Sequence, residues 1–118
     1  MNVQCLIVDD SDAFLASATR LLESEGFSVT GTARSADQAL QLARKLKPDV
    51  ALVDVEVGEE SGFEIVRRLA SAVPATPTIL ISMYPEVDLR DAIAISPALG
   101  FIPKSKLNAA AVSRLLRS

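Results

Sequence analysis

Two spacings of hydrophobic residues alternate along the 118-residue chain. Short runs in which almost every residue is apolar are typical of strands buried on both faces. Stretches in which apolar residues recur every three or four positions are typical of helices with one buried face. The runs predict strands at Gln4–Val8, Phe27–Gly31, Val50–Val53, Thr78–Ser82 and Leu99–Pro103. The stretches between them predict five helices, of which the last three are Gly62–Ala72, Glu86–Ile95 and Lys106–Leu116, and a polar loop lies at Glu56–Ser61.

Polar residues and glycines mark the ends of the first two helices. Ser11 can cap the first helix, and Gly26 is placed to terminate it. Leu21 falls on the apolar face of that helix, so we expect it to be buried. Ser35 with Gln38 three residues later fits a capping box at the start of the second helix, which runs to about residue 46.

The order of the predicted elements determines the fold class. Strands that alternate with helices pair in parallel through right-handed crossovers, and strands that are apolar on both faces need helices on both sides of the sheet. We therefore expect an α/β protein, a three-layer α/β/α sandwich around a doubly wound, five-stranded parallel sheet. The strand order 2-1-3-4-5 is common at this size. Residues 1–118 are few enough to form a single domain.

Composition excludes several classes of function. Hydrophobic residues make up 49% of the chain and the net charge is −3, so it lacks the basic surface typical of nucleic-acid binders or of proteins that adhere to anionic membranes. The absence of His excludes imidazole catalysis and His-ligated zinc. A single cysteine, Cys5, excludes an internal disulfide and favours a reducing cytoplasm. We expect Cys5 to be a small buried hydrophobe.

Polar side chains stand where the predicted strands end. These are Asp9 and Asp10 after the first strand, Asp54 after the third, Ser82 at the end of the fourth and Lys104 after the fifth. In an open parallel sheet, the ligand site lies beyond the carboxyl ends of the strands, where the strand order reverses. We therefore expect three carboxylates, a hydroxyl and an ammonium to share one crevice.

This set of side chains suits phosphoryl chemistry. Clustered carboxylates repel one another and need a compensating charge, which a hard divalent cation such as Mg²⁺ supplies through oxygen ligands. Lys104 is a compact donor for one phosphoryl oxygen, and Ser82 can donate to another. Asp54 is central between the first and fourth strands, which makes it the natural nucleophile, because carboxylates form aspartyl phosphates.

Four segments of the chain, in this order, resemble one known family. They are Val8-Asp9-Asp10-Ser11, Val53-Asp54 with Gly62 eight residues on, Leu80-Ile81-Ser82, and Gly100-Phe101-Ile102-Pro103-Lys104-Ser105. Each segment is common alone, but the four together, with family-like spacing, are highly specific. Over essentially its whole length the chain resembles the receiver domain of two-component response regulators, which have the CheY-like variant of the flavodoxin-like fold.

The resemblance implies a role for each residue of the acidic site. Asp54 corresponds to the phosphoacceptor and Lys104 to the phosphate-binding lysine. Asp9 and Asp10 correspond to the acidic pair that binds Mg²⁺ or Mn²⁺ together with Asp54. The backbone carbonyl of Glu56 is a further metal ligand in this correspondence.

The resemblance also implies residues that switch the conformation and tune its lifetime. Ser82 corresponds to the switch hydroxyl, and Phe101 to the switch aromatic that turns inward on phosphorylation. Glu56 and Tyr84 lie two residues beyond Asp54 and Ser82, where side chains influence self-dephosphorylation. We expect Tyr84 to restrict water and so lengthen the phosphorylated state. Met83 stands where a small residue is usual, and we expect its side chain to crowd the phosphoryl pocket.

Two departures concern the backbone near the site. Gly58 stands where the loop after the acceptor often has proline, so we expect a more mobile loop. Pro103 precedes Lys104, whereas many relatives have a proline in a cis peptide after this lysine.

The function that the resemblance implies is a phosphorylation-dependent signalling switch. A sensor histidine kinase or a phosphotransfer protein would donate the phosphoryl group from a phospho-His, since this chain has no His. The face formed by the fourth helix, fifth strand and fifth helix would then repack and alter partner binding. The chain would not be an enzyme beyond its own phosphorylation and slow dephosphorylation. Two alternatives stay open: a pseudo-receiver that is never phosphorylated, and a haloacid-dehalogenase-like phosphatase that uses Asp54 and Glu56.

The same resemblance suggests the cellular setting. We expect a bacterial, cytoplasmic protein that contacts neither nucleic acid nor membrane directly. The start at Met1 and the short polar end favour a free-standing regulator over a receiver that has lost its output domain. A free-standing regulator would act on a downstream protein partner. Aliphatic residues on the fourth and fifth helices leave homodimerisation through that face open.

Overall fold

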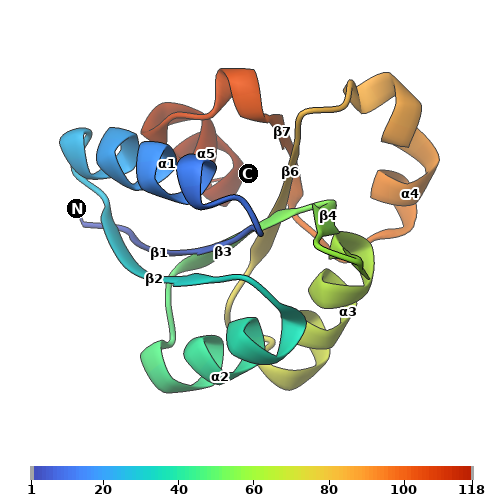
Figure 1. Cartoon of the computed structure of the whole chain (residues 1–118), viewed down its shortest axis with the longest axis horizontal. Helices are drawn as coiled ribbons and strands as arrows, with labels where there is room; N and C mark the ends of the chain where they lie inside the picture. The colour runs from blue at the N-terminus through green and yellow to red at the C-terminus, as the bar shows by residue number, and fades with distance from the viewer. Residues whose placement is uncertain (1, 118) are drawn as a thin grey trace.

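The computed structural model describes residues 2–117 and has the predicted three-layer architecture (Figure 1). The central sheet is parallel, with the strand order β2-β1-β3-β6-β7. Its strands are β1 (Gln4–Val8), β2 (Ser28–Ala33), β3 (Val50–Asp54), β6 (Thr78–Ser82) and β7 (Gly100–Pro103). This is the predicted order 2-1-3-4-5 once two short strands outside the sheet, β4 and β5, are set aside.

Helices cover both faces of the sheet. On one face lie α1 (Asp12–Ser24) and α5 (Ala109–Leu116), and on the other lie α2 (Ala36–Leu46) and α3 (Gly62–Ala72), as Figure 1 shows. The short α4 (Arg90–Ile95) stands beside α3. Within residues 2–117, no helix is long and apolar enough to cross a membrane.

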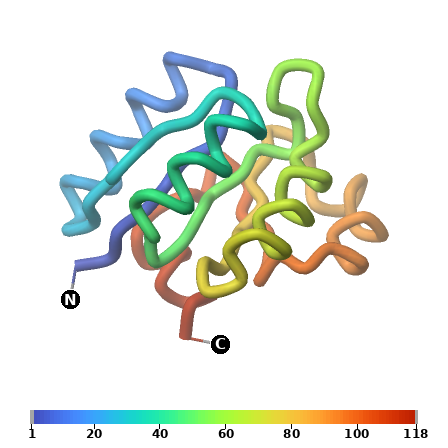
Figure 2. The backbone as a smooth tube through the Cα atoms, turned by 90° about the horizontal axis from the view of Figure 1, so that it is seen from below, coloured from blue at the N-terminus to red at the C-terminus, as the bar shows by residue number. Residues whose placement is uncertain are grey.

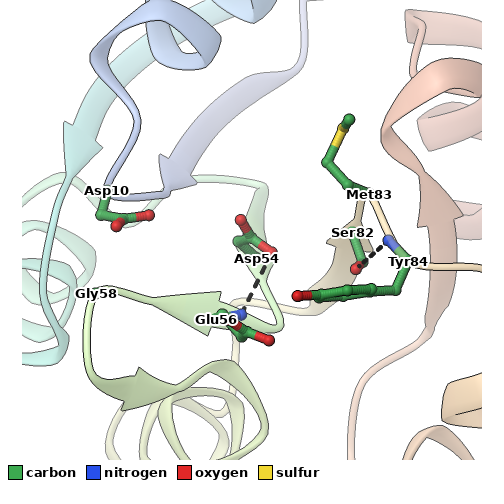
Figure 3. Close-up of a pocket in the computed structure, with 7 residues that line it drawn as sticks. All are labelled: Asp10, Asp54, Glu56, Gly58, Ser82, Met83 and Tyr84. Atoms are coloured by element: carbon green, nitrogen blue, oxygen red, sulfur yellow. Dashed lines mark hydrogen bonds between the residues drawn. The ribbon is translucent and has the colours of Figure 1, made fainter.

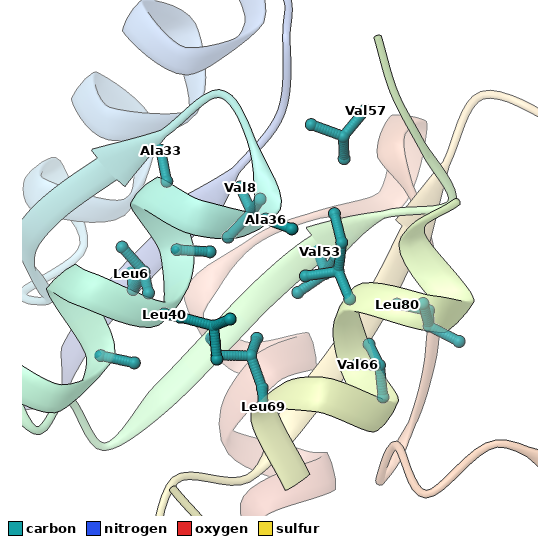
Figure 4. Close-up of a cluster of buried hydrophobic side chains, with 14 of the residues drawn as sticks. Leu6, Val8, Ala33, Ala36, Leu40, Val53, Val57, Val66, Leu69 and Leu80 are labelled. Carbon is teal, nitrogen blue, oxygen red and sulfur yellow. The ribbon is translucent and has the colours of Figure 1, made fainter. Parts of the chain in front are cut away.

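The alternation of side chains along each strand separates the core into two clusters. Leu6 and Val8 point toward α2 and α3 and pack in the cluster of Figure 4, while Cys5 and Ile7 point toward α1 and α5. Both faces of β1 are therefore buried, which explains the continuous apolar run in the sequence. Burial raises the pKa of the Cys5 thiol to about 12, so Cys5 stays protonated and packs as a hydrophobe.

Several boundaries differ from the predicted ones. The second strand begins at Ser28 and continues to Ala33. Phe27 packs in the core just before it, and the register of β2 against β1 shifts between Cys5 and Leu6. The fourth helix is divided into a 3-10 turn, η1 (Glu86–Leu89), and α4, and neither contains a fully buried residue. The last helix begins later than predicted. A 3-10 turn, η2 (Lys104–Lys106), comes first, and the side chain of Asn108 then caps α5.

Two local expectations for the first helices are wrong. The side chain of Leu21 is 39% exposed, because it lies at the margin of the buried face of α1. Ser35 caps α2 as predicted, accepting the Gln38 N–H, but the Gln38 side chain accepts the N–H of Arg34 rather than that of Ser35. The reciprocal bond of a capping box is thus displaced by one residue.

The segment after Asp54 is a small hairpin rather than an open loop. Strands β4 (Glu56–Val57) and β5 (Glu60–Ser61) pair in antiparallel fashion, with Gly58 in the turn at a φ of +62°. Val57 is buried in the core, and the Glu60 carboxylate accepts the backbone N–H of Ala36 at the start of α2, 2.9 Å away. These two anchors oppose the mobility that Gly58 alone predicts. The hairpin projects at the end of the molecule opposite the chain termini (Figure 2).

Candidate functional site

The predicted site residues converge at the carboxyl ends of the central strands. Asp9 follows β1, Asp54 ends β3, Ser82 ends β6 and Lys104 follows β7. The pairing of β1 with β3, β3 with β6 and β6 with β7 brings these four segments side by side. A cavity of about 200 Å³ opens there, lined by Asp10, Asp54, Glu56, Gly58, Ser82, Met83 and Tyr84 (Figure 3).

One ammonium connects the two buried carboxylates. Lys104 Nζ lies 2.7 Å from Asp9 Oδ2 and 2.9 Å from Asp54 Oδ2. The Lys104 side chain is only 9% exposed. A buried charge is stable only when paired, so each of these three groups depends on the others.

The pKa values of the pair reflect burial and mutual attraction. Burial raises the pKa of Asp54 and the Asp9 charge adds to this effect, whereas the contact with Lys104 opposes it without cancelling it. Burial lowers the pKa of Lys104, but the two carboxylates outweigh that effect and raise its pKa above the ordinary value. Lys104 is therefore held in its charged form, while the Asp54 carboxylate is destabilised relative to one in water.

Three carboxylates have the geometry of a cation site. Oxygen atoms of Asp9, Asp10 and Asp54 all lie within 4.8 Å of one another. Asp9 Oδ1 accepts the Ser11 N–H, but the buried Oδ2 has no hydrogen bond of regular geometry, only the ion pair with Lys104. Such an underused oxygen beside two other carboxylates fits the all-oxygen coordination of Mg²⁺. These residues therefore fit the predicted metal. The metal role of the Glu56 backbone carbonyl stays a prediction.

Asp10 allows the metal site to be tested without disturbing the buried ion pairs. Its side chain is exposed and does not pair with Lys104. We expect Asp10→Asn to leave the free energy of unfolding in EDTA within about 0.5 kcal/mol of the wild type. Because one anionic ligand is lost, Mg²⁺ affinity should fall by roughly tenfold or more.

Thermal unfolding measured across a Mg²⁺ titration gives both quantities. The matched control is Asp12→Asn, which removes the same charge from an exposed residue outside the carboxylate cluster. Equal Mg²⁺ affinity in the two variants would show that Asp10 is not a ligand.

The predicted switch residues lie on adjacent strands. Ser82 is buried, and its hydroxyl oxygen accepts the Tyr84 N–H at 2.9 Å. Phe101 is half-buried and packs against the core cluster that also contains its cross-strand partner Leu80. Phe101 thus has neighbours on one side and free surface on the other. Its inward rotation stays a prediction.

Met83 and Tyr84 lie at the mouth of the cavity but point in different directions. The Met83 side chain is 80% exposed and points away from Asp54 in Figure 3. Met83 nevertheless lines the cavity, so its crowding of the phosphoryl pocket stays a prediction. The Tyr84 ring extends across the mouth toward Glu56 and is 51% exposed.

Two contacts at the site were not predicted from the sequence. The ring of Phe14, on α1, lies under Lys104 with 4.1 Å between Nζ and the ring centroid. Arg34, after β2, forms an ion pair with Asp12 and reaches the Asp10 carbonyl oxygen at 3.4 Å. An aromatic residue at helical spacing is normally a core residue, and no local pattern distinguishes Phe14 from one.

A doubly wound sheet with three carboxylates and one lysine at the point where its strand order reverses is the arrangement of a receiver domain. The family model described as "Response regulator receiver domain" matches residues 5–115. The chain belongs to this family.

Similar proteins include a response regulator and an enzyme, both longer than this chain. The chain is 33% identical over 103 residues to response regulator GacA of Pseudomonas aeruginosa, covering 86% of this chain and 48% of that protein. It is 36% identical over 107 residues to a protein-glutamate methylesterase/protein-glutamine glutaminase of Alkalilimnicola ehrlichii, covering 88% of this chain and 27% of that protein. The chain thus spans about half the length, or less, of the curated relatives that it matches.

Solved structures share the fold over nearly the whole chain. The receiver domain of a modulated diguanylate cyclase from Desulfovibrio desulfuricans is 29% identical, with a TM-score of 0.82, covering 99% of this chain and 92% of that chain. A response regulator from Thermotoga maritima is 27% identical, with a TM-score of 0.84 and full coverage of both chains.

Proposed function

We propose that this chain is a phosphorylation-dependent signalling switch whose phosphoacceptor is Asp54. The observation that carries the proposal is the ion-pair geometry. The Asp54 carboxylate faces the cavity, is paired with a buried lysine, and stands beside two further carboxylates that fit a divalent cation. A nucleophile, a cation for the phosphoryl oxygens and a metal position are thus within reach of one another.

In the proposed step, one Asp54 carboxylate oxygen attacks the phosphorus of the donor. A bond forms between that oxygen and phosphorus, and the bond from phosphorus to the donor's histidine nitrogen breaks. The nitrogen leaves with the bonding electron pair. The product is an acyl phosphate on Asp54, which water later hydrolyses to phosphate and the free carboxylate. The Lys104 ammonium stabilises the negative charge on the phosphoryl oxygens during this transfer.

The metal would be held by Asp9, Asp10 and Asp54, with the Glu56 backbone carbonyl as a further ligand. Bound Mg²⁺ or Mn²⁺ would neutralise charge on the phosphoryl oxygens. Without the metal, Lys104 is the only cation paired with Asp9 and Asp54 among residues 2–117, which leaves excess negative charge in the site.

Phosphorylation adds charge and strong acceptor oxygens beside Ser82. We infer that the Ser82 hydroxyl gives up its contact with the Tyr84 N–H to donate to the phosphoryl group, and that Phe101 turns into the space vacated. The face formed by α4, β7 and α5 would repack as a result. Ile95, the last residue of α4, and Leu99, which directly precedes β7, are exposed apolar residues that such a change could cover or reposition.

The partners follow from this chemistry. The donor would be a sensor histidine kinase or phosphotransfer protein, and the receiver of the signal would be a downstream protein or an output domain. The repacked face could also bind a second copy of the chain. We place the protein in the bacterial cytoplasm. We do not assign it an enzymatic activity beyond its own phosphorylation and dephosphorylation.

Incubation with acetyl phosphate tests the proposal without a known kinase. We expect intact mass spectrometry to show a gain of one phosphoryl group that requires Mg²⁺ and is absent in Asp54→Asn. A folded, Mg²⁺-binding protein without this gain would indicate the pseudo-receiver alternative. Turnover of phosphate esters without a phosphorylated protein would indicate the phosphatase alternative.

Tyr84 is expected to set the lifetime of the phosphorylated state. Because its ring extends across the mouth of the cavity, it limits the approach of water to the phosphorus. Tyr84→Ala should therefore accelerate dephosphorylation several-fold, measured as the decay of the phosphorylated mass after removal of acetyl phosphate. Val87→Ala, which truncates an exposed apolar residue that does not line the cavity, is the control. Equal decay rates in wild type and Tyr84→Ala would remove this role.

A further inference from the structure

The ammonium of Lys104 is surrounded by three partners. Two are the carboxylate oxygens of Asp9 and Asp54, at 2.7 and 2.9 Å. The third is the face of the Phe14 ring, whose centroid lies 4.1 Å from Nζ. A lysine ammonium has three N–H donors and needs a stabilising partner for each when it is desolvated. An aromatic face within about 6 Å attracts a cation through its quadrupole, most strongly where water is excluded.

The position of the ring is set by the same turn that supplies Asp9. Asp9 Oδ1 accepts the Ser11 N–H at 2.9 Å, and Ser11 Oγ in turn accepts the Phe14 N–H at 3.2 Å, which caps α1. Phe14 is half-buried and packs against the core cluster on the α1 and α5 face. The β1–α1 turn therefore presents a carboxylate and an aromatic face to one ammonium, with little freedom for either to move.

We propose that Phe14 is a positioning residue that holds the Lys104 ammonium beside Asp54. Without the ring, water could reach the ammonium from the side of α1, and the flexible lysine stem could move away from the carboxylates. With the ring in place, the charge is already fixed where phosphoryl oxygens would arrive. The contact itself is independent of the proposed function, whereas its effect on rate rests on that function.

The contact can be tested by NMR in the metal-free protein. Protons that lie over an aromatic face are shifted upfield, so we expect upfield Lys104 Hε signals in the wild type. Phe14→Leu, which keeps a large apolar side chain but removes the ring, should return these signals to ordinary values. Phe63→Leu is the matched control, because Phe63 is also a half-buried residue in the first turn of a helix, on the opposite face of the sheet. Ordinary Lys104 signals in the wild type would overturn the contact.

The effect on rate is tested with acetyl phosphate and Mg²⁺. We expect Phe14→Leu to lower the rate of phosphorylation at saturating acetyl phosphate by roughly tenfold relative to Phe63→Leu. Fluorinated phenylalanines placed at position 14 keep the shape of the ring and weaken its quadrupole stepwise. They should lower the rate progressively with the number of fluorines, even if Phe14→Leu folds poorly.

The outcomes separate this proposal from the function on which it rests. Equal rates for all variants, with a normally phosphorylated wild type, would overturn the positioning role and leave Asp54 as the acceptor. A wild type that is never phosphorylated would overturn the proposed function and the effect on rate together, while the NMR signals would still decide the contact.

Discussion

Replacement of Lys104 by methionine should destabilise the metal-free protein by roughly 3 kcal/mol and abolish phosphorylation. The side chains of Lys104, Asp9 and Asp54 are all at least 88% buried, and the ammonium is the only cation paired with either carboxylate among residues 2–117. Removal of one member of a buried ion pair leaves its partners charged and unpaired. That penalty is much larger than the loss of a surface ion pair.

Denaturant unfolding in EDTA gives the loss in free energy, and the matched control is Lys106→Met. Lys106 lies two residues away and is exposed, so its replacement should change stability by less than about 0.5 kcal/mol. We expect Mg²⁺ to recover part of the loss in Lys104→Met, because a divalent cation restores positive charge between the carboxylates. Similar stabilities for the two variants in EDTA would contradict the account of the buried ion pairs.

The second large effect concerns Gly62, at the start of α3. A Cβ at this position would lie 1.8 Å from the Asp54 carbonyl oxygen and 2.7 Å from the Val55 Cα, both backbone atoms that cannot move independently of the site. The Gly62 N–H also donates to the Val55 carbonyl at 2.7 Å. We expect Gly62→Ala to destabilise the protein by roughly 3 kcal/mol or more, since α3 would have to move away from the end of β3.

Gly26→Ala separates this steric effect from the general effect of losing a glycine. Gly26 has a φ of +99°, but a Cβ added there would meet no atom within 4 Å, so only backbone strain is expected. That strain costs about 1–2 kcal/mol. Denaturant unfolding of both variants measures the difference. A Gly62→Ala protein no less stable than Gly26→Ala would show that α3 can shift without loss.

The strands of the sheet and the polar residues at their carboxyl ends could be predicted because both appear as short-range patterns in the sequence. Continuous apolar runs such as Thr78–Ser82 are bounded by polar residues, so the strand ends could be located to within a residue or two. The parallel order of strands then follows from chain topology, and it brings Asp9, Asp54 and Lys104 together.

The features that were missed depend on contacts between distant segments. The Glu56–Ser61 segment was predicted to be a polar loop, but β4 and β5 pair as a hairpin. Burial of Val57 and the hydrogen bond from the Ala36 N–H to the Glu60 carboxylate anchor this hairpin. The place of Phe14 under Lys104 depends on the relative position of α1 and β7, which no local spacing encodes.

The most direct test of the central claim is to locate the phosphoryl group. After incubation with acetyl phosphate and Mg²⁺, sodium borohydride reduces an aspartyl phosphate to homoserine, and tandem mass spectrometry of the peptides then identifies the modified position. We expect homoserine at position 54 and nowhere else, with none formed when Mg²⁺ is omitted. Modification at another carboxylate, or a mass gain that persists in Asp54→Asn, would contradict this claim.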